Sequence, residues 1–314
     1  MAQFQWIPDI PSGVLRNHHL SRKLFEASVA NSRFMEFVRP IEGFGKKQGE
    51  TVTLTRISNI AEPTSGKLTE GVRIPEDTFA ITTLAITVAE FGRAVPYTSL
   101  AEDLAWFDLS NGIQSKLVEQ QKLILDAAAS AAFKTAKVKY APTGLATNNI
   151  ATNGTFGAQA AANWNVFHVE EIRDYLFDTL QAPPFVDEDY VALVRTLGLR
   201  GIKRDPQWEE WHKYTSPENK MTGETGRIEQ IRFIEINHST SLGKVGASSV
   251  LGEGVVFGAD AVAMAEVTTP ELRAAIPGDF GRSKAVAWYG ILEFGLIWDT
   301  GNAGEAKVVH VGST

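Results

Sequence analysis

The clearest pattern in the sequence is an alternation of apolar and polar residues at positions 51–57. Val52 and Leu54 alternate with threonines at the period of two that is typical of a β-strand with one buried face. A second apolar run, 79–88, changes phase at Thr82-Thr83, which we interpret as a β-bulge. The two runs predict a long β-hairpin. Because a two-stranded ribbon is marginal by itself, it must lie on its own body or on a neighbouring subunit.

The segment between these two strands predicts a solvated hairpin tip. Residues 61–77 contain prolines and glycines that favour turns, together with charged side chains of both signs. Such a segment has little apolar surface to bury, so we expect it to project into solvent.

A helical periodicity follows at residues 110–137. Ile113, Leu117 and Ile124 recur at spacings of four and seven, and Ser110 is a residue type that caps a helix N-terminus. The pattern predicts one long helix of roughly 40 Å, at about 1.5 Å per residue. Small residues at 127–132 would allow another backbone to approach closely.

The remainder of the chain predicts an α+β unit and a return through strands. After a loop at 140–165, we expect a helix at 166–180, a strand at 190–194, a short helix, an aromatic segment with Trp208, Trp211 and Tyr214, and a strand at 228–236. Further strands are expected at 255–265, 285–298 and 306–311, with a helix-like segment at 270–276. Since strand follows strand in this last part, we expect an antiparallel sheet. Its core strand is marked by one phase of large apolar residues, Trp288, Leu292, Phe294, Leu296 and Trp298.

Composition and charge narrow the possible functions. The chain has 314 residues, of which 44% are apolar, so it can bury a sizeable core. Its formal charge of −7 lacks the basic excess of a general nucleic-acid binder. The absence of cysteine excludes disulfide scaffolds and thiolate chemistry. No apolar run reaches the roughly 18 residues of a membrane span, and no secretory signal pattern opens the chain, so we expect a soluble protein made inside the cell.

Few residues suggest catalysis. The acidic cluster Asp187-Glu188-Asp189 could supply paired carboxylates for glycoside hydrolysis or for a hard cation, but loop acids beside a strand are commonly just solvated. His168 and Glu171 form an i,i+3 pair that is more typical of a helix surface than of a metal site. We therefore predict no catalytic residue, no cofactor and no metal site.

The order of these elements resembles that of a tailed-bacteriophage major capsid protein with the Hong Kong 97 type of fold. Two sequence segments carry most of the resemblance, GEGVVFGADAVAMAEV (Gly252 to Val267) and KAVAWYGILEFGLIWD (Lys284 to Asp299). They look like the paired strand motifs of a podophage-type coat family within that fold. The segment EFGRAV (Glu90 to Val95) also fits. The resemblance implies an α+β, Hong Kong 97-like capsid fold with an N-terminal arm, an extended β-hairpin loop, a long spine helix, and peripheral and axial domains.

The resemblance also implies a division of the chain into parts. These are an N-terminal arm (1–40), an extended β-hairpin loop (41–95), a peripheral domain with the spine helix (96–165), an axial domain (166–245), and return strands that complete the peripheral domain (246–314).

By the same resemblance, the protein would be a structural coat subunit and not an enzyme. Relatives assemble into hexamers and pentamers of an icosahedral shell around double-stranded DNA, so this chain would be made in the host cytoplasm and end in the virion capsid. A net acidic shell suits only weak, non-specific contact with packaged DNA. The expected inter-subunit contacts of the hairpin tip are Thr64, Gly66, Lys67, Glu70, Arg73 and Glu76.

Other partners follow from the resemblance as well. Some relatives begin with a cleaved scaffolding segment of roughly a hundred residues, whereas here only the arm and hairpin precede the helix at Ser110. A separate scaffolding protein is therefore implied, together with a portal protein and an optional decoration protein, and no membrane. Some relatives crosslink a hairpin lysine to an asparagine, but nothing identifies a partner for Lys67, so we predict no crosslink.

Two alternatives remain open from the sequence. A bacterial nanocompartment shell of the encapsulin type has the same fold and encloses cargo enzymes instead of a genome. A carbohydrate-active enzyme would use Asp187, Glu188 or Asp189 as carboxylates, with Trp208 and Trp211 stacking on sugars.

Overall fold

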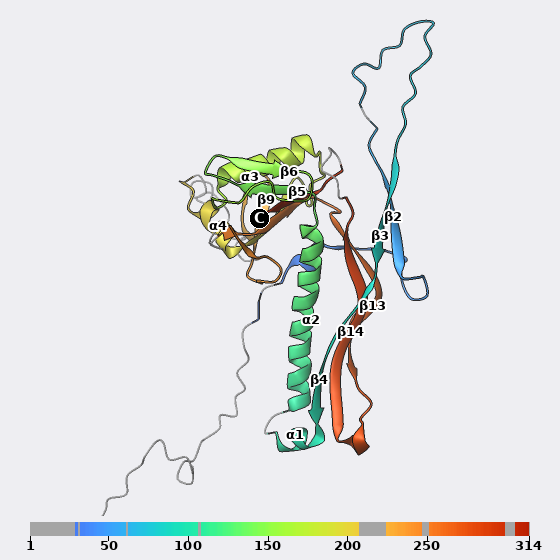
Figure 1. Ribbon diagram of the computed structural model, residues 1–314, viewed down its shortest axis with the longest axis vertical. Coiled ribbons are helices and arrows are strands. Elements are labelled where there is room, and N and C mark those ends of the chain that lie inside the picture. The colour runs from blue at the N-terminus through green and yellow to red at the C-terminus, as the bar shows by residue number, and fades with distance from the viewer. Residues whose placement is uncertain are drawn as a thin grey trace, which may run out of the picture.

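The computed structural model describes residues 29–30, 32–60, 62–105, 108–206, 224–246, 251–298 and 305–313. It contains a sheet-rich body, an elongated part in which one long helix lies beside long strands, and a hairpin that projects away from both (Figure 1). Residues 1–28 of the expected arm, and the aromatic residues Trp208, Trp211 and Tyr214, lie outside the described residues.

The long helix α2 (Leu109–Lys134) confirms the predicted spine helix. Its N-cap is Asp108 rather than Ser110, because the Asp108 carboxylate accepts a hydrogen bond from the Asn111 backbone N–H at 3.0 Å. The short helix α1 (Ser99–Leu104) precedes it. Among the helices of the described residues, none is both long enough and apolar enough to cross a bilayer.

A four-stranded sheet lies along α2 (Figure 1). Leu117 of the helix packs with Val286 and Trp288 of the central strand, whose side chains alternate between buried and half-buried as the sequence predicted. The strand order is β1 (Arg39–Pro40), β13 (Val262–Ala274), β14 (Ser283–Leu296) and β4 (Ala89–Thr98).

The expected helix-like segment at 270–276 is wrong, because β13 continues as a strand to Ala274. The register with β14 shifts between Glu266 and Thr268 and again between Thr268 and Glu271. Pro270 lies in this irregular stretch. It is beyond the two residues of β13 that pair with β1, so its missing N–H removes no hydrogen bond from that pairing. The proline suggested a helix start but marks an irregular sheet edge.

A seven-stranded sheet forms the body. Its order is β6 (Asn148–Ala151), β5 (Val138–Pro142), β15 (Val308–Val311), β12 (Gly254–Phe257), β7 (Tyr190–Arg195), β9 (Ile231–Ile236) and β8 (Glu224–Ile228). The expected antiparallel pairing of the C-terminal strands is confirmed for β13 with β14 and for β12 with β15. The seven-stranded sheet as a whole is nevertheless mixed, because β15 pairs with β5, and β7 with β9, in parallel. These pairs join segments distant in sequence, so the succession of strands could not reveal their direction.

The single strand predicted at 228–236 is wrong, because parts of two strands lie there. The run 228–236 contains the end of β8, a two-residue turn and β9. Glu229 and Gln230 both have positive φ (44° and 60°), as a tight hairpin turn of the mirror-image type requires. Neither residue is glycine, so the sequence lacked the usual signal for the turn.

Two helices pack on the seven-stranded sheet, α3 (Val166–Asp174) and α4 (Thr196–Lys203). A π-helical turn (Tyr175–Thr179) continues α3. The sheet takes strands from both sides of the expected limits at 165/166 and 245/246. The spatial units are therefore built from discontinuous segments, and the division into peripheral and axial domains stays a prediction. The described residues also contain two 3-10 turns (Phe34–Phe37 and Asp279–Gly281) and a pair of short strands, β10 (Lys244–Val245) and β11 (Leu251–Gly252).

The projecting hairpin confirms the first prediction. Strands β2 (Thr51–Ile57) and β3 (Ile81–Thr87) pair in continuous antiparallel register. The expected bulge at Thr82-Thr83 is wrong, because each of these threonines has its own partner in β2. The change of phase has another cause: Ile81 is apolar but exposed, whereas Ile86 is buried against β13.

Candidate functional site

The polar contact residues predicted from the sequence all lie in the hairpin tip. Thr64, Gly66, Lys67, Glu70, Arg73 and Glu76 are exposed, and the tip extends well away from the rest of the chain (Figure 1). Arg73 and Glu76 form an ion pair with each other, with side chains 83% and 72% exposed. The tip therefore presents charge to solvent without touching its own body.

The hairpin also carries an apolar face that the sequence did not predict. Val52 and Leu54 face the protein's own body, so Ile57, at the opposite parity, faces away. Ile57 pairs with Ile81 across the hairpin, and these side chains are 61% and 58% exposed. Phe79, at the parity of Ile81, is 55% exposed. Further exposed apolar side chains of the hairpin are Ile60, Leu68, Val72 and Ile74.

A second exposed apolar surface lies at the far end of the elongated part, which we call the distal tip. It consists of Leu100 and Leu104 of α1 with Ile276 and Phe280 of the turn between β13 and β14. The two elements are fixed side by side, because the Ser99 N–H donates to the Arg282 carbonyl at 3.0 Å. In Figure 1 the distal tip lies at the bottom and the hairpin at the top.

Backbone strain holds an aromatic ring outward at the distal tip. Asp279 and Phe280 have φ of 49° and 55°, in the left-handed region that disfavours residues other than glycine. The Phe280 side chain is fully exposed. An exposed aromatic ring on a strained turn buries no surface against the described residues, which points to a contact beyond them.

A buried ionic cluster joins the end of α2 to the seven-stranded sheet; we call it the junction cluster. The Lys134 ammonium lies 3.0 Å from Glu253 Oε2. His310 Nε2 lies 2.7 Å from Glu253 Oε1, and Lys139 Nζ lies 2.9 Å from His310 Nδ1. Lys139 also donates to the Lys134 carbonyl at 2.6 Å. Glu253, His310 and Lys139 are all buried.

Burial and neighbouring charge shift the pKa values of the junction cluster. Burial lowers the pKa of Lys139 to about 8, although the Glu253 carboxylate opposes the shift. Burial also lowers the pKa of His310; the Glu253 carboxylate opposes this shift, while the Lys139 and Lys134 charges add to it. Burial alone would raise the pKa of Glu253, but the hydrogen bonds from His310 and from the Gly243 N–H, together with the Lys134 charge, lower it to about 2.

Comparison with solved structures identifies the fold. The chain is similar over 99% of its length to a chain of the head structure of Helicobacter pylori bacteriophage KHP40, covering 98% of that chain with a TM-score of 0.72 at 13% identity. It covers 100% of its own length and 99% of the capsid protein of cyanophage Pam1, with a TM-score of 0.72 at 15% identity. It is also similar over 99% of its length to a chain of the capsid of Ralstonia phage GP4, covering 97% of that chain with a TM-score of 0.66 at 13% identity. The chain has the Hong Kong 97-type capsid fold. No family model and no curated protein matches the sequence.

Within this capsid fold, the acidic cluster at 187–189 does not form a pair of catalytic carboxylates. The Asp189 side chain is 2% exposed and lies 2.7 Å from both Arg227 Nη2 and Arg232 Nε, so its charge is compensated. Asp187 is 85% exposed and makes only a loose ion pair with Arg232, at 4.0 Å. A buried, paired aspartate beside a solvated one is an arrangement for stability rather than for general acid and base chemistry.

A serine, a histidine and an aspartate from distant parts of the chain also meet in the capsid fold, an arrangement that was not predicted from the sequence. Ser241 Oγ donates to Asp126 Oδ2 at 2.6 Å, and His238 Nδ1 lies 2.6 Å from Ser241 Oγ. Because the serine proton goes to the aspartate, the histidine does not accept it as a general base would. Asp126 and Ser241 are completely buried. The group therefore anchors α2 to the loop after β9.

His168 is likewise a structural residue. Its ring nitrogens lie 2.9 Å from the Tyr140 hydroxyl and 2.9 Å from the Gly144 carbonyl, so both are engaged. Burial lowers its pKa. Its expected neighbour Glu171 instead accepts a hydrogen bond from Asn148 at 3.3 Å. In the part of the chain that the structure describes, histidines and carboxylates do not gather into any group of three that could hold a metal ion.

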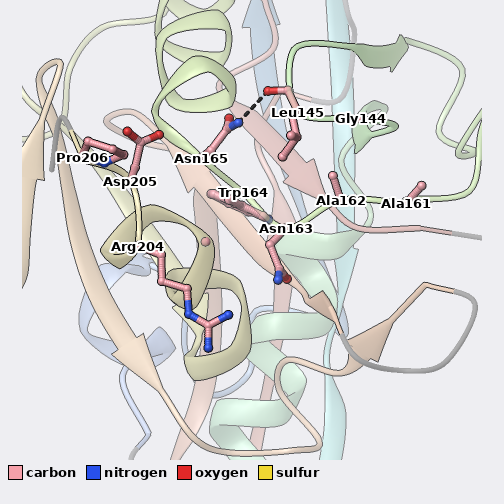
Figure 2. Close-up of a pocket in the computed structure, with 11 residues that line it drawn as sticks. Gly144, Leu145, Ala161, Ala162, Asn163, Trp164, Asn165, Arg204, Asp205 and Pro206 are labelled. Atoms are coloured by element: carbon pink, nitrogen blue, oxygen red, sulfur yellow. Dashed lines mark hydrogen bonds between the residues drawn. The ribbon is translucent and has the colours of Figure 1, made fainter.

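An open pocket of about 630 Å³ lies between α4 and the N-terminus of α3 (Figure 2). Its polar groups serve the ends of these helices: the Asn165 amide donates to the Leu145 carbonyl, and Asp205 accepts from the Val166 N–H at 3.3 Å. These groups do not converge on one point, so the pocket lacks the arrangement of an active site. The lining residues are Gly144, Leu145, Ala161, Ala162, Asn163, Trp164, Asn165, Gly201, Arg204, Asp205 and Pro206.

Proposed function

We propose that this protein is a major capsid protein, which self-assembles into hexamers and pentamers of an icosahedral shell that encloses double-stranded DNA. The supporting observation is the end-to-end match to head and capsid proteins of several phages, with nearly the full length of both chains aligned. A match over nearly the whole chain includes the projecting hairpin, whose tip is exposed and extends away from the body of its own chain (Figure 1).

The surface of the chain supports assembly from identical copies. A monomer rarely exposes contiguous apolar patches of this kind, and here they lie at two opposite ends of the molecule. Two separate contact surfaces on each copy allow the extended, closed lattice that a shell requires, because each subunit can join different neighbours at each end.

In this proposal the hairpin provides one class of contact. Its apolar face, with Ile57, Phe79 and Ile81, supplies buried area. The charged residues Lys67, Glu70, Arg73 and Glu76, with Thr64 and Gly66, set the register against the neighbour. The distal tip supplies the second class. Peripheral and axial domains, a separate scaffolding protein, a portal protein, a decoration protein and weak contact with packaged DNA belong to the same proposal.

Electron microscopy tests the proposal directly. The full-length protein is expressed alone and then with candidate scaffold genes from its locus, purified and imaged. Closed shells, or rings of five and six subunits, are expected. A uniform monomer or dimer under both conditions would overturn the proposal. Nucleic acid inside shells supports a phage head, whereas shells filled with a cargo enzyme would identify a nanocompartment instead.

A further inference from the structure

The junction cluster lies where three parts of the chain meet. Lys134 is the last residue of α2, Lys139 belongs to β5 and His310 to β15, while Glu253 lies between β11 and β12. Buried charges at such a point cost free energy unless every one of them is compensated. Here each group has a partner, so the cluster depends on one particular state of protonation.

That state can be derived from the hydrogen bonds. An ammonium group has only donors, so Lys139 donates to His310 Nδ1, which must carry its lone pair. The ring proton then sits on Nε2 and is donated to the Glu253 carboxylate. His310 is therefore neutral in the closed arrangement, between one cation and one anion.

A second proton on the ring cannot be accommodated in this geometry. It would sit on Nδ1 and face the Lys139 ammonium across 2.9 Å, a donor against a donor and one positive charge against another. The charged and titratable groups that face His310 are Glu253, Lys139 and the more distant Lys134. Two of these three are cations, so Glu253 alone cannot compensate a protonated ring.

We propose that the junction cluster is a proton-operated latch between the end of α2 and the seven-stranded sheet, closed while His310 is neutral and opened when His310 takes up a proton. Opening separates Lys139 from His310 and releases the end of the helix from β5 and β15. The helix stays attached through Asp126, which accepts hydrogen bonds from the Phe34 N–H at 2.7 Å and from Ser241 Oγ at 2.6 Å. The latch therefore frees the angle between helix and sheet without unfolding either one.

Hydrogen exchange of the full-length protein tests the latch. Amide protection in segments 132–142 and 306–313, corrected for intrinsic exchange, is compared between pH 7.5 and pH 4.5, with β14 as the internal reference. We expect protection at the junction to fall by about tenfold in acid while β14 changes little. Unchanged protection at the junction would overturn the proposal. Since the experiment measures the chain itself, its result is independent of whether shells form.

Two variants separate a latch from a merely structural role. His310→Gln retains one donor and one acceptor but cannot be protonated, so its protection should not depend on pH. Lys139→Met removes the opposing cation, so a protonated His310 can pair with Glu253 and the junction should stay closed in acid. A variant that loses protection in acid as the wild type does would overturn the mechanism; if one variant fails to fold, the other gives the same contrast.

Histidine NMR supplies the matching control. In Lys139→Met, the pKa of His310 should rise toward the ordinary value near 6.5, because one of the causes of its depression is gone. His168 is also buried with a lowered pKa, but its ring faces the neutral Tyr140 hydroxyl and Gly144 carbonyl, so its titration should not move. An unmoved His310 would contradict the proposed role of Lys139.

Discussion

Ile57 and Ile81 face each other across the last register pair of β2 and β3, and both side chains remain more than half exposed. They lie on the face of the hairpin opposite the residues that pack on the body. We therefore predict that the double substitution Ile57→Ser and Ile81→Ser leaves the free energy of unfolding within about 1 kcal/mol of wild type but prevents shell formation. Chemical denaturation and negative-stain electron microscopy measure the two effects.

The matched control for the hairpin lies on the same face, nearer the body. Thr53 and Ala85 form a register pair there, and Thr53→Ser with Ala85→Ser alters little apolar surface. This control should assemble normally. Normal shells from the isoleucine variant as well would show that the apolar face of the hairpin is not a contact surface.

Phe280 gives a prediction for the distal tip. Its ring is fully exposed and its φ of 55° suits asparagine better than phenylalanine. Phe280→Asn should therefore keep the monomer within about 0.5 kcal/mol of wild-type stability, while loss of the ring raises the protein concentration needed for assembly by about tenfold or more. Light scattering across a concentration series measures this shift.

The control for this prediction is the preceding residue. Asp279→Asn keeps a side chain that tolerates the left-handed conformation and removes only a loose, exposed ion pair with Arg282. Its assembly should match wild type. If Phe280→Asn assembles at the wild-type concentration, the distal tip takes no part in contacts between copies.

The sequence predicted the elements whose signal is local. The alternation at 51–57, the helical spacing from Ile113 to Ile124 and the phase of Trp288 and Leu292 all follow from which face of one element is buried. Pairing between distant segments leaves no such trace, so the parallel neighbours β5 and β15 were missed. The individual helices and strands could therefore be predicted from the sequence, whereas the parallel pairings of the mixed sheet could not.

The candidate contact surfaces were predicted only in part, for a physical reason. Charged residues of the hairpin tip can be predicted to be exposed from the sequence alone, because burying an unpaired charge costs free energy. Exposed apolar residues such as Ile81 and Phe280 look in a sequence like core residues, and only the fold shows that the described part of the chain leaves them uncovered. The phase change near Ile81 was the one available signal, and it suggested a bulge instead.

Asp189 provides a prediction about stability. It is buried and accepts from Arg227 and Arg232, which follow 38 and 43 positions later. Asp189→Asn should lower the free energy of unfolding by about 2 kcal/mol, less than for a fully buried pair because both arginines are partly exposed. Asp187→Asn, two residues earlier and exposed, should change it by less than about 0.5 kcal/mol. Equal effects in urea denaturation would mean that the buried pairing is not what stabilises this edge of the sheet.

Glu253 provides a prediction about how the free energy of unfolding falls in acid. Its pKa is lowered to about 2 in the folded chain, against 4.5 as the ordinary value, so the unfolded chain binds the proton more readily. The resulting stabilisation is fully present above about pH 4.5 and is lost as the pH falls toward 2, by a few kcal/mol at most. Glu253→Gln should be less stable at neutral pH and should lose less stability than wild type between pH 4.5 and pH 2.5. Denaturant midpoints of wild type and Glu253→Gln, measured across this pH range, test the prediction. If both midpoints fall equally with pH, the Glu253 carboxylate is not held ionised by His310 and Lys134.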